Sequence, residues 1–339
     1  MTIREAIDDL LTGRDLSTPT AAAALNDIVD GDIDPAVIAA FLVALRMKGE
    51  TADEVAGLAR TMRDAAIPVR PKATGLVDCC GTGGDGSGTV NISTAVAFVL
   101  AGAGLPVAKH GNRALSSKAG SADVLEAVGV PLDLSADDVA RCIDEAGIGF
   151  MFAPAFHPAM AKVMPVRRAL GIRTAFNVLG PLTNPALPSF QLVGVGAPEL
   201  LEVVAGALAV LGVERAIVVH GCGGADELTC EAPCEAVLVE DETTEHITLD
   251  ASDAGLESNG LDSLRGGTAE DNAEILRTTL LGKPGPVLDC VLFNAGAAFM
   301  AARRAGTIAE GVDLARDVIE RGDANAALDR LVAVATGGS

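Results

Sequence analysis

Residues 81–94 read GTGGDGSGTVNIST, a glycine-rich stretch that stands between two apolar runs. The preceding run, LVDCC at 76–80, is typical of a short strand, and STAVAFVLAGAG at 93–104 is typical of a helix. Glycines in such a turn let backbone amides approach a ligand closely, and the following helix directs the positive end of its dipole toward the turn. The stretch is therefore a candidate phosphate-binding junction between a strand and a helix.

The spacing of these glycines does not select a common nucleotide-binding motif. Residues 81–86 match GxGxxG literally, but a dinucleotide fold needs an acidic residue about 20 positions later, at the end of the next strand. Here that strand ends in Lys109 and His110, and the next acid is Asp123. The GK[ST] ending of a Walker loop is also missing. Dehydrogenase and nucleoside triphosphatase functions are thus disfavoured. For this loop taken alone, an ordinary strand–turn–helix junction capped by Ser and Thr remains a possible interpretation.

A basic, hydroxyl-rich segment follows at 109–121, KHGNRALSSKAGS. It carries three permanent cations, three serines and no carboxylate, whereas a solvated charged face normally mixes both signs. A second segment without acids, 146–198, contains Lys162, Arg167, Arg168 and Arg173. Because the chain has 46 Asp and Glu among its 339 residues, the exclusion of acids from both segments predicts a site for a polyanion.

The composition is that of a globular protein and argues against several partners. With 339 residues and 49% hydrophobic content, the chain can bury a large core and divide into two domains. A formal net charge of −21 argues against nucleic acid or an anionic membrane as a partner. The longest apolar run, 95–108, is too short to cross a bilayer, and the acidic start MTIREAIDDLLTG lacks the form of a signal peptide. We therefore expect a soluble, cytoplasmic protein.

The chain has seven cysteines and no CxxC spacing. Cys222, Cys230 and Cys234 fall close together, but no histidine or fourth cysteine stands at the spacing of a zinc site. Small buried thiols in a reducing compartment are the interpretation that we prefer.

The order of helical and strand patterns predicts an α/β protein with two domains. Residues 1–72 read as helices only, with a capping box at Thr51 and Glu54 and a strongly apolar helix that begins at Pro35. Residues 73–339 are expected to form a larger α/β domain with a central, largely parallel sheet flanked by helices. The expected strands are 76–80, 105–110, 147–153, 191–196 and 215–221, with a possible hairpin of 235–241 and 245–250 and helices over about the last 70 residues. In such sheets ligands bind at the carboxyl ends of the strands.

Asp226 and Glu227 follow the expected strand 215–221, in the segment GCGGADELT. Adjacent carboxylates after glycines usually lie in a solvated turn, and they can also bind a divalent cation. The residues alone leave both interpretations open.

Three segments together resemble the anthranilate phosphoribosyltransferases: GTGGDGSGTVNIST at 81–94, KHGNRALSSKAGSADVLEAVG at 109–129 and HPAMAKVMPVRRALGIRTAFNVLGPLTNP at 157–185. The N-terminal helices and SLRGGTAEDNAEIL at 263–276 fit this family too, so the resemblance covers nearly the whole chain. The first two segments are partly shared with pyrimidine nucleoside phosphorylases, and the third is more specific. The resemblance implies a small all-helical N-terminal domain, joined in space by helices from about 160–185, beside the larger α/β domain. The strongly apolar helix at 35–48 packs either inside the helical domain or against a second subunit, and the second interpretation predicts a homodimer through that domain.

The resemblance also implies the residues of three sites. For 5-phosphoribosyl 1-pyrophosphate they are Gly81, Gly84, Asp85, Thr89, Asn91, Ile92, Ser93, Thr94, Lys109, His110, Gly111, Asn112, Arg113, Ala114, Leu115, Ser116, Ser117 and Ser121. For anthranilate they are Gly81, Asn112, Arg167, His157 and Pro181, and for Mg²⁺, expected as two ions per subunit, they are Ser93, Asp226 and Glu227. A plain surface cation is the alternative interpretation of Arg167.

The implied reaction is attack of the anthranilate amine on C1 of the ribose, with loss of pyrophosphate and inversion of configuration. An aromatic amine is uncharged at pH 7, so we expect no discrete catalytic acid or base. Two alternatives stay open: a pyrimidine nucleoside phosphorylase, and a non-catalytic homologue of the same fold that binds nucleic acid.

Overall fold

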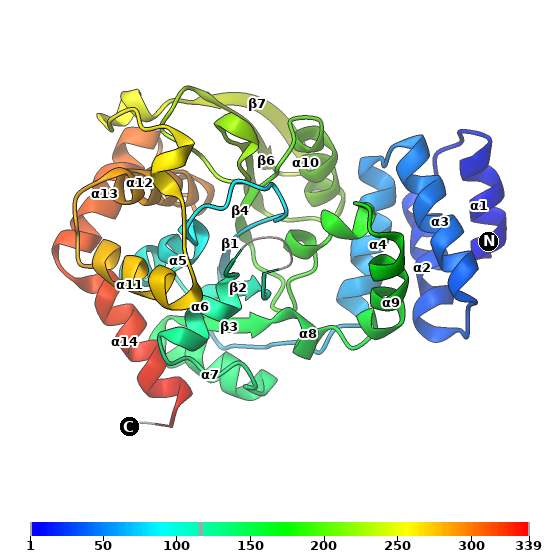
Figure 1. Ribbon diagram of the computed structural model, residues 1–339, viewed down its shortest axis with the longest axis horizontal. Helices are drawn as coiled ribbons and strands as arrows, with labels where there is room; N and C mark the ends of the chain where they lie inside the picture. Colours follow the sequence, from blue (N-terminus) through cyan, green and yellow to red (C-terminus); the bar gives the residue numbers. More distant parts are fainter. Residues whose placement is uncertain (1, 115–117, 338–339) are drawn as a thin grey trace.

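The computed structural model describes residues 2–114 and 118–337, which form a helical part and an α/β part side by side (Figure 1). The helical part begins with α1 (Ile3–Leu11), α2 (Thr18–Asp30), α3 (Pro35–Lys48) and α4 (Ala52–Asp64). The predicted capping box is confirmed, because Thr51 and Glu54 form it at α4. At the start of α3 the Asp34 carboxylate accepts the Ala36 amide.

A later segment of the chain returns to this bundle. Helix α9 (Met160–Leu170) packs against α2 and α3, and Lys162 donates to the Val29 and Gly31 carbonyls at 2.6 and 3.0 Å. The 3₁₀ turn η1 (Ala175–Asn177) follows, and Phe176 lies in the same hydrophobic core as α1–α4. The division of the chain at residues 72 and 73 remains a prediction.

The α/β part contains a seven-stranded sheet in the order β3-β2-β1-β4-β5-β6-β7. Strands β1 to β5 are parallel, and β6 and β7 pair antiparallel at one edge, so the predicted sheet and hairpin are confirmed. The strands are β1 (Val77–Gly81), β2 (Val107–Gly111), β3 (Ile148–Phe152), β4 (Phe190–Gly194), β5 (Arg215–His220), β6 (Cys234–Glu240) and β7 (Thr243–Leu249).

Helices cover both faces of this sheet. On one face α5 and α12 contact the central strands, and α13 and α14 pack behind α5. On the other face α10 lies over β5 and β6 and also packs against α4, so the two parts share one hydrophobic core. The helices of this part are α5 (Ile92–Gly102), α6 (Ser121–Ala127), α7 (Ala136–Ala146), α8 (Ala153–Phe156), α10 (Leu200–Val210), α11 (Ala269–Leu280), α12 (Pro286–Ala301), α13 (Ile308–Glu320) and α14 (Asp323–Ala335).

The strand order reverses beside β1. From β1 the chain moves through α5 to β2 on one side, and β4 then pairs with β1 on the other side. In parallel sheets, ligands bind at the carboxyl ends of the strands at such a switch point. Here those ends are Gly81 and Gly194, which are neighbours in the sheet. Within the described parts of the chain, no helix has the length and apolarity needed to cross a membrane.

Candidate functional site

The predicted glycine-rich turn lies between β1 and α5, at this switch point. Gly83, Gly84, Gly86 and Gly88 all have positive φ, between 66° and 78°. An L-residue in this left-handed region is disfavoured by roughly 1–2 kcal/mol. The path of the turn therefore depends on glycine at these four positions.

Asp226 and Glu227 lie against this turn, although the bonded partners are 143 and 138 residues apart in the sequence. The Gly83 amide donates to the Asp226 carboxylate at 2.6 Å, and the Thr89 hydroxyl donates to Glu227, also at 2.6 Å. Asp85 is a third neighbouring carboxylate, because the Asp226 amide donates to it at 3.4 Å. Glu227 is only 9% exposed. The interpretation of this acid pair as a solvated turn is therefore wrong.

Three glycines at strand ends make room for the acid pair. A Cβ atom at Gly81 would overlap the Asp226 carboxylate, and one at Gly194 would overlap the Asp226 main-chain carbonyl. A Cβ atom at Gly221, just after β5, would overlap the carbonyl of Glu227. Of these three glycines, only Gly81 was predicted as a site residue from the sequence. The other two could be recognised only as glycines at the ends of expected strands, because the groups that require them arrive from another part of the chain.

Burial raises the pKa of both acids, and repulsion from a neighbouring carboxylate adds to this effect. For Asp226 the repulsion comes chiefly from Asp85, and for Glu227 it comes from Asp226. Carboxylates whose charge is poorly compensated favour a nearby cation. Their oxygen atoms are the donors that Mg²⁺ prefers, and Mg²⁺ commonly keeps positions for substrate phosphate oxygens. The pair therefore fits the predicted metal.

Lys109 is a buried cation next to these acids. Its side chain is 2% exposed, and its ammonium donates to the Cys79 carbonyl at 2.8 Å and to the Ser93 hydroxyl at 3.3 Å. Its positive charge lowers the pKa of Glu227, but burial raises that pKa by more. An ammonium has three donors, and in the part of the chain that the structure describes only these two acceptors are found. One donor is thus available for a ligand.

Three residues at the start of α5, all predicted for the site, lie in different surroundings. Asn91 forms a bridge: its amide nitrogen donates to the Ala119 carbonyl at 3.2 Å, and its amide oxygen accepts from Asn272 of α11 at 3.0 Å. Ile92 is 1% exposed inside the core, so only its main chain can face a ligand. The Thr94 hydroxyl is buried and has no partner among residues 2–114 and 118–337. Asn272 was not foreseen as part of this region.

The basic segment after β2 differs from the expected carboxylate-free cradle. Arg113 donates to Asp123 at 2.7 Å and to Glu126 at 2.8 Å, so its charge is paired with α6 rather than left free. The segment is therefore not free of carboxylates in space, because helix α6 returns two acids to it. The Ala114 amide donates to the same Asp123 at 3.1 Å.

Other predicted members of this segment lie close to one another. The Asn112 carbonyl accepts the Ser121 hydroxyl at 3.3 Å, and Gly111 ends β2 beside them. Leu115, Ser116 and Ser117 lie outside the described residues.

His110 and His157 form a buried pair with Nε2 atoms 3.2 Å apart. The His110 Nδ1 lies 3.1 Å from the Gly180 carbonyl. A carbonyl only accepts, so this Nδ1 carries the proton and His110 Nε2 must accept from His157. The Nδ1 of His157 is then an acceptor, and no donor for it occurs within the described chain. Burial lowers the pKa of His110 to about 3 and that of His157 to about 4, so both rings are neutral at pH 7. Pro181 follows Gly180 directly.

Arg167 lies on α9, half-buried above the Phe176 ring at 5.6 Å from its centroid. Burial lowers the pKa of Arg167, and no described carboxylate lies within 4 Å of its guanidinium. The surface-cation interpretation is therefore wrong for Arg167, although it fits its exposed neighbour Arg168. A half-buried arginine without an anion is a suitable partner for the carboxylate of a ligand.

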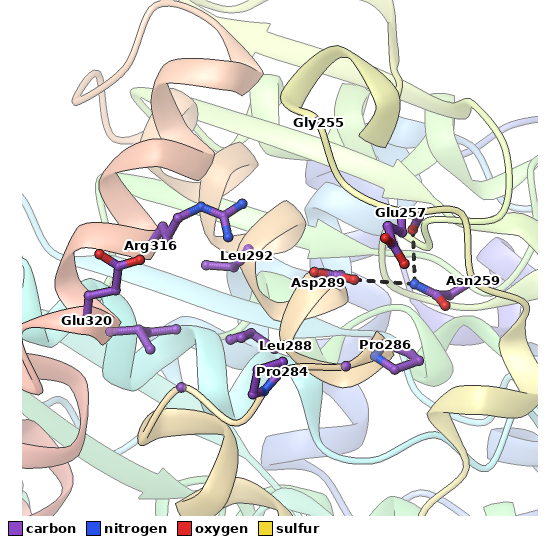
Figure 2. Close-up of a pocket in the computed structure, with 13 residues that line it drawn as sticks. Gly255, Glu257, Asn259, Pro284, Pro286, Leu288, Asp289, Leu292, Arg316 and Glu320 are labelled. Atoms are coloured by element: carbon purple, nitrogen blue, oxygen red, sulfur yellow. Dashed lines mark hydrogen bonds between the residues drawn. The ribbon is translucent and has the colours of Figure 1, made fainter.

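A cavity of about 560 Å³ lies away from this constellation, between the start of α12, the end of α13 and residues 255–259 (Figure 2). Glu257, Asp289 and Arg316 are among its lining residues, and Asn259 donates to Asp289 at 3.4 Å. None of the residues predicted for the site lines this cavity.

Comparisons with known proteins cover both parts of the chain. A model described as the helical bundle domain of a glycosyl transferase family matches residues 4–66, and one described as the a/b domain of that family matches residues 73–325. The anthranilate phosphoribosyltransferase of Thermomicrobium roseum is 53% identical over 333 residues, which are 97% of this chain and 95% of that protein.

Two solved structures extend this similarity. The anthranilate phosphoribosyltransferase of Thermus thermophilus superposes with a TM-score of 0.92 at 45% identity, over 98% of this chain and 99% of that one. The Saccharomyces cerevisiae anthranilate phosphoribosyltransferase in complex with PRPP and Mg superposes with a TM-score of 0.89 at 28% identity, over 99% of this chain and 98% of that one.

Proposed function

The chain belongs to the anthranilate phosphoribosyltransferase family, and from this premise we infer the reaction of its site. It transfers the phosphoribosyl group of 5-phosphoribosyl 1-pyrophosphate to the amine of anthranilate, giving N-(5-phosphoribosyl)anthranilate and pyrophosphate, a step of tryptophan biosynthesis. The observation that carries this conclusion is the contact of Asp226 and Glu227 with the glycine-rich turn, beside the buried Lys109.

We propose that the turn and the two segments beside it bind phosphoribosyl pyrophosphate. Four groups support this proposal: the glycines of the turn, the uncompensated donor of Lys109, the first turn of α5, and the main chain after β2. The proposed residues are Gly81, Gly84, Asp85, Thr89, Asn91, Ile92, Ser93, Thr94, Lys109, His110, Gly111, Asn112, Ala114 and Ser121. Leu115, Ser116 and Ser117 remain sequence-based expectations. Arg113 is left out because its guanidinium is paired with Asp123 and Glu126.

Anthranilate is proposed to lie between Arg167 and the histidine pair. The guanidinium of Arg167 has no anionic partner in the described chain, so it can bind the carboxylate of anthranilate. The free acceptor Nδ1 of His157 and the ring of Pro181 would complete this side, with Gly81 and Asn112 as further contacts of anthranilate.

The enzyme uses Mg²⁺, and we propose that Asp226, Glu227 and the Ser93 hydroxyl hold it, with two ions in each subunit. The raised pKa of both acids and their oxygen donors support this assignment. Bound there, Mg²⁺ would supply positive charge opposite the pyrophosphate.

The chain's own residues would do the rest by binding and orientation. The amine forms its bond to C1 as the bond from C1 to the pyrophosphate oxygen breaks, and the amine proton leaves afterwards. Negative charge then builds up on the leaving group, next to Lys109 and the amides of the turn. Fixed donors of this kind are worth about 2.7–4 kcal/mol each when one is removed. Two neutral histidines present no positive charge that would repel the developing cation at C1.

The test is the consumption of anthranilate, followed by its fluorescence, with phosphoribosyl pyrophosphate and with or without Mg²⁺. We expect Mg²⁺-dependent loss of anthranilate with one pyrophosphate released per turnover. Phosphorolysis of pyrimidine nucleosides without any anthranilate turnover would contradict the proposal, and so would nucleic-acid binding by an inactive protein.

We also propose that two copies of the chain associate through the helical part and that the enzyme works in the cytoplasm. The support for a dimer is the pair of exposed apolar side chains on adjacent helices, Leu11 at the end of α1 and Met47 on α3.

A further inference from the structure

An arginine that follows α9 reaches across to the glycine-rich turn. Gly171, with φ of 62°, ends the helix, and Arg173 comes two residues later. Its Nη1 donates to the Gly84 carbonyl at 2.6 Å, and its Nη2 donates to the Gly83 carbonyl at 3.4 Å. The bonded residues are 89 and 90 positions apart in the sequence. This contact joins the helical part of the molecule to the ligand-binding turn.

The segment that carries Arg173 is firmly held. Before it, α9 packs against α2 and α3, and Lys162 donates to two carbonyls at the end of α2. After it, the Thr174 amide donates to Asn177 at 2.9 Å, and Phe176 is buried in the core of the helical part. The guanidinium is therefore presented by a rigid support.

The turn itself has little intrinsic rigidity. Five of the eight residues 81–88 are glycine, and glycine loses more conformational freedom on folding than any other residue. The far end of the turn is held by the Gly266 amide, which donates to the Gly88 carbonyl at 2.8 Å, and by the Val90 amide, which donates to Leu264 at 2.8 Å. The near end is held by Asp226 and Arg173.

The hydrogen bonds from Arg173 to the Gly83 and Gly84 carbonyls also orient two main-chain amides. The carbonyl of Gly83 and the amide of Gly84 belong to one planar trans peptide unit and point in opposite directions, and the same holds for Gly84 and Asp85. The amides of Gly84 and Asp85 donate to no acceptor in the part of the chain that the structure describes. Arg173 thus fixes two unused donors on the side of the turn away from itself.

We propose that Arg173 is a positioning residue: it orients the Gly84 and Asp85 amides for the phosphates and couples the turn to α9, which carries Arg167. This inference rests on the proposed function, because it takes these amides to be phosphate donors. Arg167 and Arg173 lie six positions apart on one supported segment, so a shift of α9 at the anthranilate side also moves the anchor of the turn.

The test compares Arg173→Gln and Arg173→Lys with the control Arg168→Gln, which changes an exposed arginine on α9. Calorimetry with phosphoribosyl pyrophosphate and excess Mg²⁺ should show about tenfold weaker binding for Arg173→Gln, since two hydrogen bonds from a charged group are lost. Lysine has no planar fork for two carbonyls, so Arg173→Lys should not restore the affinity. The control should bind as the unchanged protein does.

A second measurement needs neither substrate nor turnover. In the ligand-free protein, ¹⁵N order parameters of Gly83, Gly84 and Asp85 should fall in both Arg173 variants, while those of β1 and α2 stay the same. Unchanged order parameters in the turn, or full rescue by lysine, would overturn the proposal. If the unchanged protein binds no phosphoribosyl pyrophosphate, the proposed function fails instead, and the relaxation data still decide whether Arg173 orders the turn.

Discussion

At the scale of single residues, the site is made of charged groups that lack the partners they would normally have. Lys109 is buried near Asp78 and Glu227, yet its hydrogen bonds among the described residues go to two neutral acceptors. Arg167 is half-buried without a carboxylate among the described residues. Asp226 and Glu227 repel each other in a buried position. Each of these arrangements is unfavourable in the protein alone. A substrate that carries a carboxylate and a Mg²⁺-bound diphosphate would supply the missing charges.

Removing the charge of Arg167 tests the anthranilate side of this account. Arg167→Ala should raise the KM for anthranilate at least tenfold, because a charge-assisted hydrogen bond contributes about 1.5–3 kcal/mol. The KM for phosphoribosyl pyrophosphate should change much less. Steady-state kinetics with each substrate varied in turn gives both values, and Arg168→Ala serves as the control. Equal effects on the two KM values would remove Arg167 from the anthranilate site.

The histidine pair allows a prediction on pH dependence. With pKa values of about 3 and 4, His110 and His157 stay neutral in the folded protein, whereas unfolded histidine takes up a proton near pH 6.5. The folded state thus binds fewer protons below pH 6.5, and the pair's contribution to the free energy of unfolding decreases as the pH falls from about 6.5 toward 4.

NMR titration of the histidine ring protons measures this directly. The resonances of His110 and His157 should not shift between pH 5 and 8 in the folded protein, and they should shift through about pH 6.5 after unfolding in urea. A folded-state shift centred between pH 6 and 7 for either ring would refute the assignment of a neutral, hydrogen-bonded pair.

At the scale of elements, the strand ends decide where the acid pair lies. The main chain and side chain of Asp226 pass directly over the carboxyl ends of β1 and β4, where Gly81 and Gly194 provide the space. At the end of β5, Gly221 provides the space for the main-chain carbonyl of Glu227. The glycines would thus act on the proposed Mg²⁺ site through the backbone of the acid pair.

Gly194→Ala should therefore weaken Mg²⁺ binding without touching a ligand. The new methyl group would overlap the carbonyl of Asp226 and displace it, so the Mg²⁺ concentration for half-maximal turnover should rise severalfold. Gly260→Ala is a suitable control, because nothing lies within 4 Å of a Cβ atom there. A Mg²⁺ titration of turnover compares the two, and identical midpoints would show that the strand-end glycine does not support the metal site.

Local patterns predicted the elements well, since each depends on residues close in sequence. The strand before Gly81, the capping box at Thr51 and the hairpin of β6 and β7 follow from patterns a few residues long. Features that depend on distant segments were not predictable. Nothing near Arg113 indicated that α6 would pair with it, and nothing near Gly194 indicated that Asp226 would cross above it. The family resemblance implied which residues face a ligand but not which groups hold those residues in place.

At the scale of the whole molecule, the site depends on the association of two parts. Helix α9 and η1 belong to the chain between β3 and β4, yet they pack with α1–α4. The residues between them place Arg173 against the glycine-rich turn of the α/β part. Helix α1 lies at the end of the helical part far from the α/β part (Figure 1), and α3 contacts both α1 and α9.

The proposed dimer is testable on α1 and α3. Leu11 is 70% exposed and Met47 is 82% exposed, and a charge at either position is tolerated in water but not in an apolar interface. The double variant Leu11→Asp and Met47→Asp should elute with half the mass of the unchanged protein in light scattering coupled to size exclusion. A similar change at Leu281, which is 67% exposed on the α/β part, should leave the mass unchanged. A monomeric unchanged protein would contradict the proposed dimer.

We propose above all that Lys109, Arg167, the free amides of the turn and the acid pair form a prepared site for anthranilate and a Mg²⁺-bound diphosphorylated sugar. Calorimetric titration of the protein with phosphoribosyl pyrophosphate measures this most directly. We predict one binding event per chain in excess Mg²⁺, and binding at least tenfold weaker when Mg²⁺ is removed or when Asp226→Asn and Glu227→Gln are combined. No heat of binding in excess Mg²⁺, or an affinity that ignores both the metal and the two carboxylates, would contradict the account.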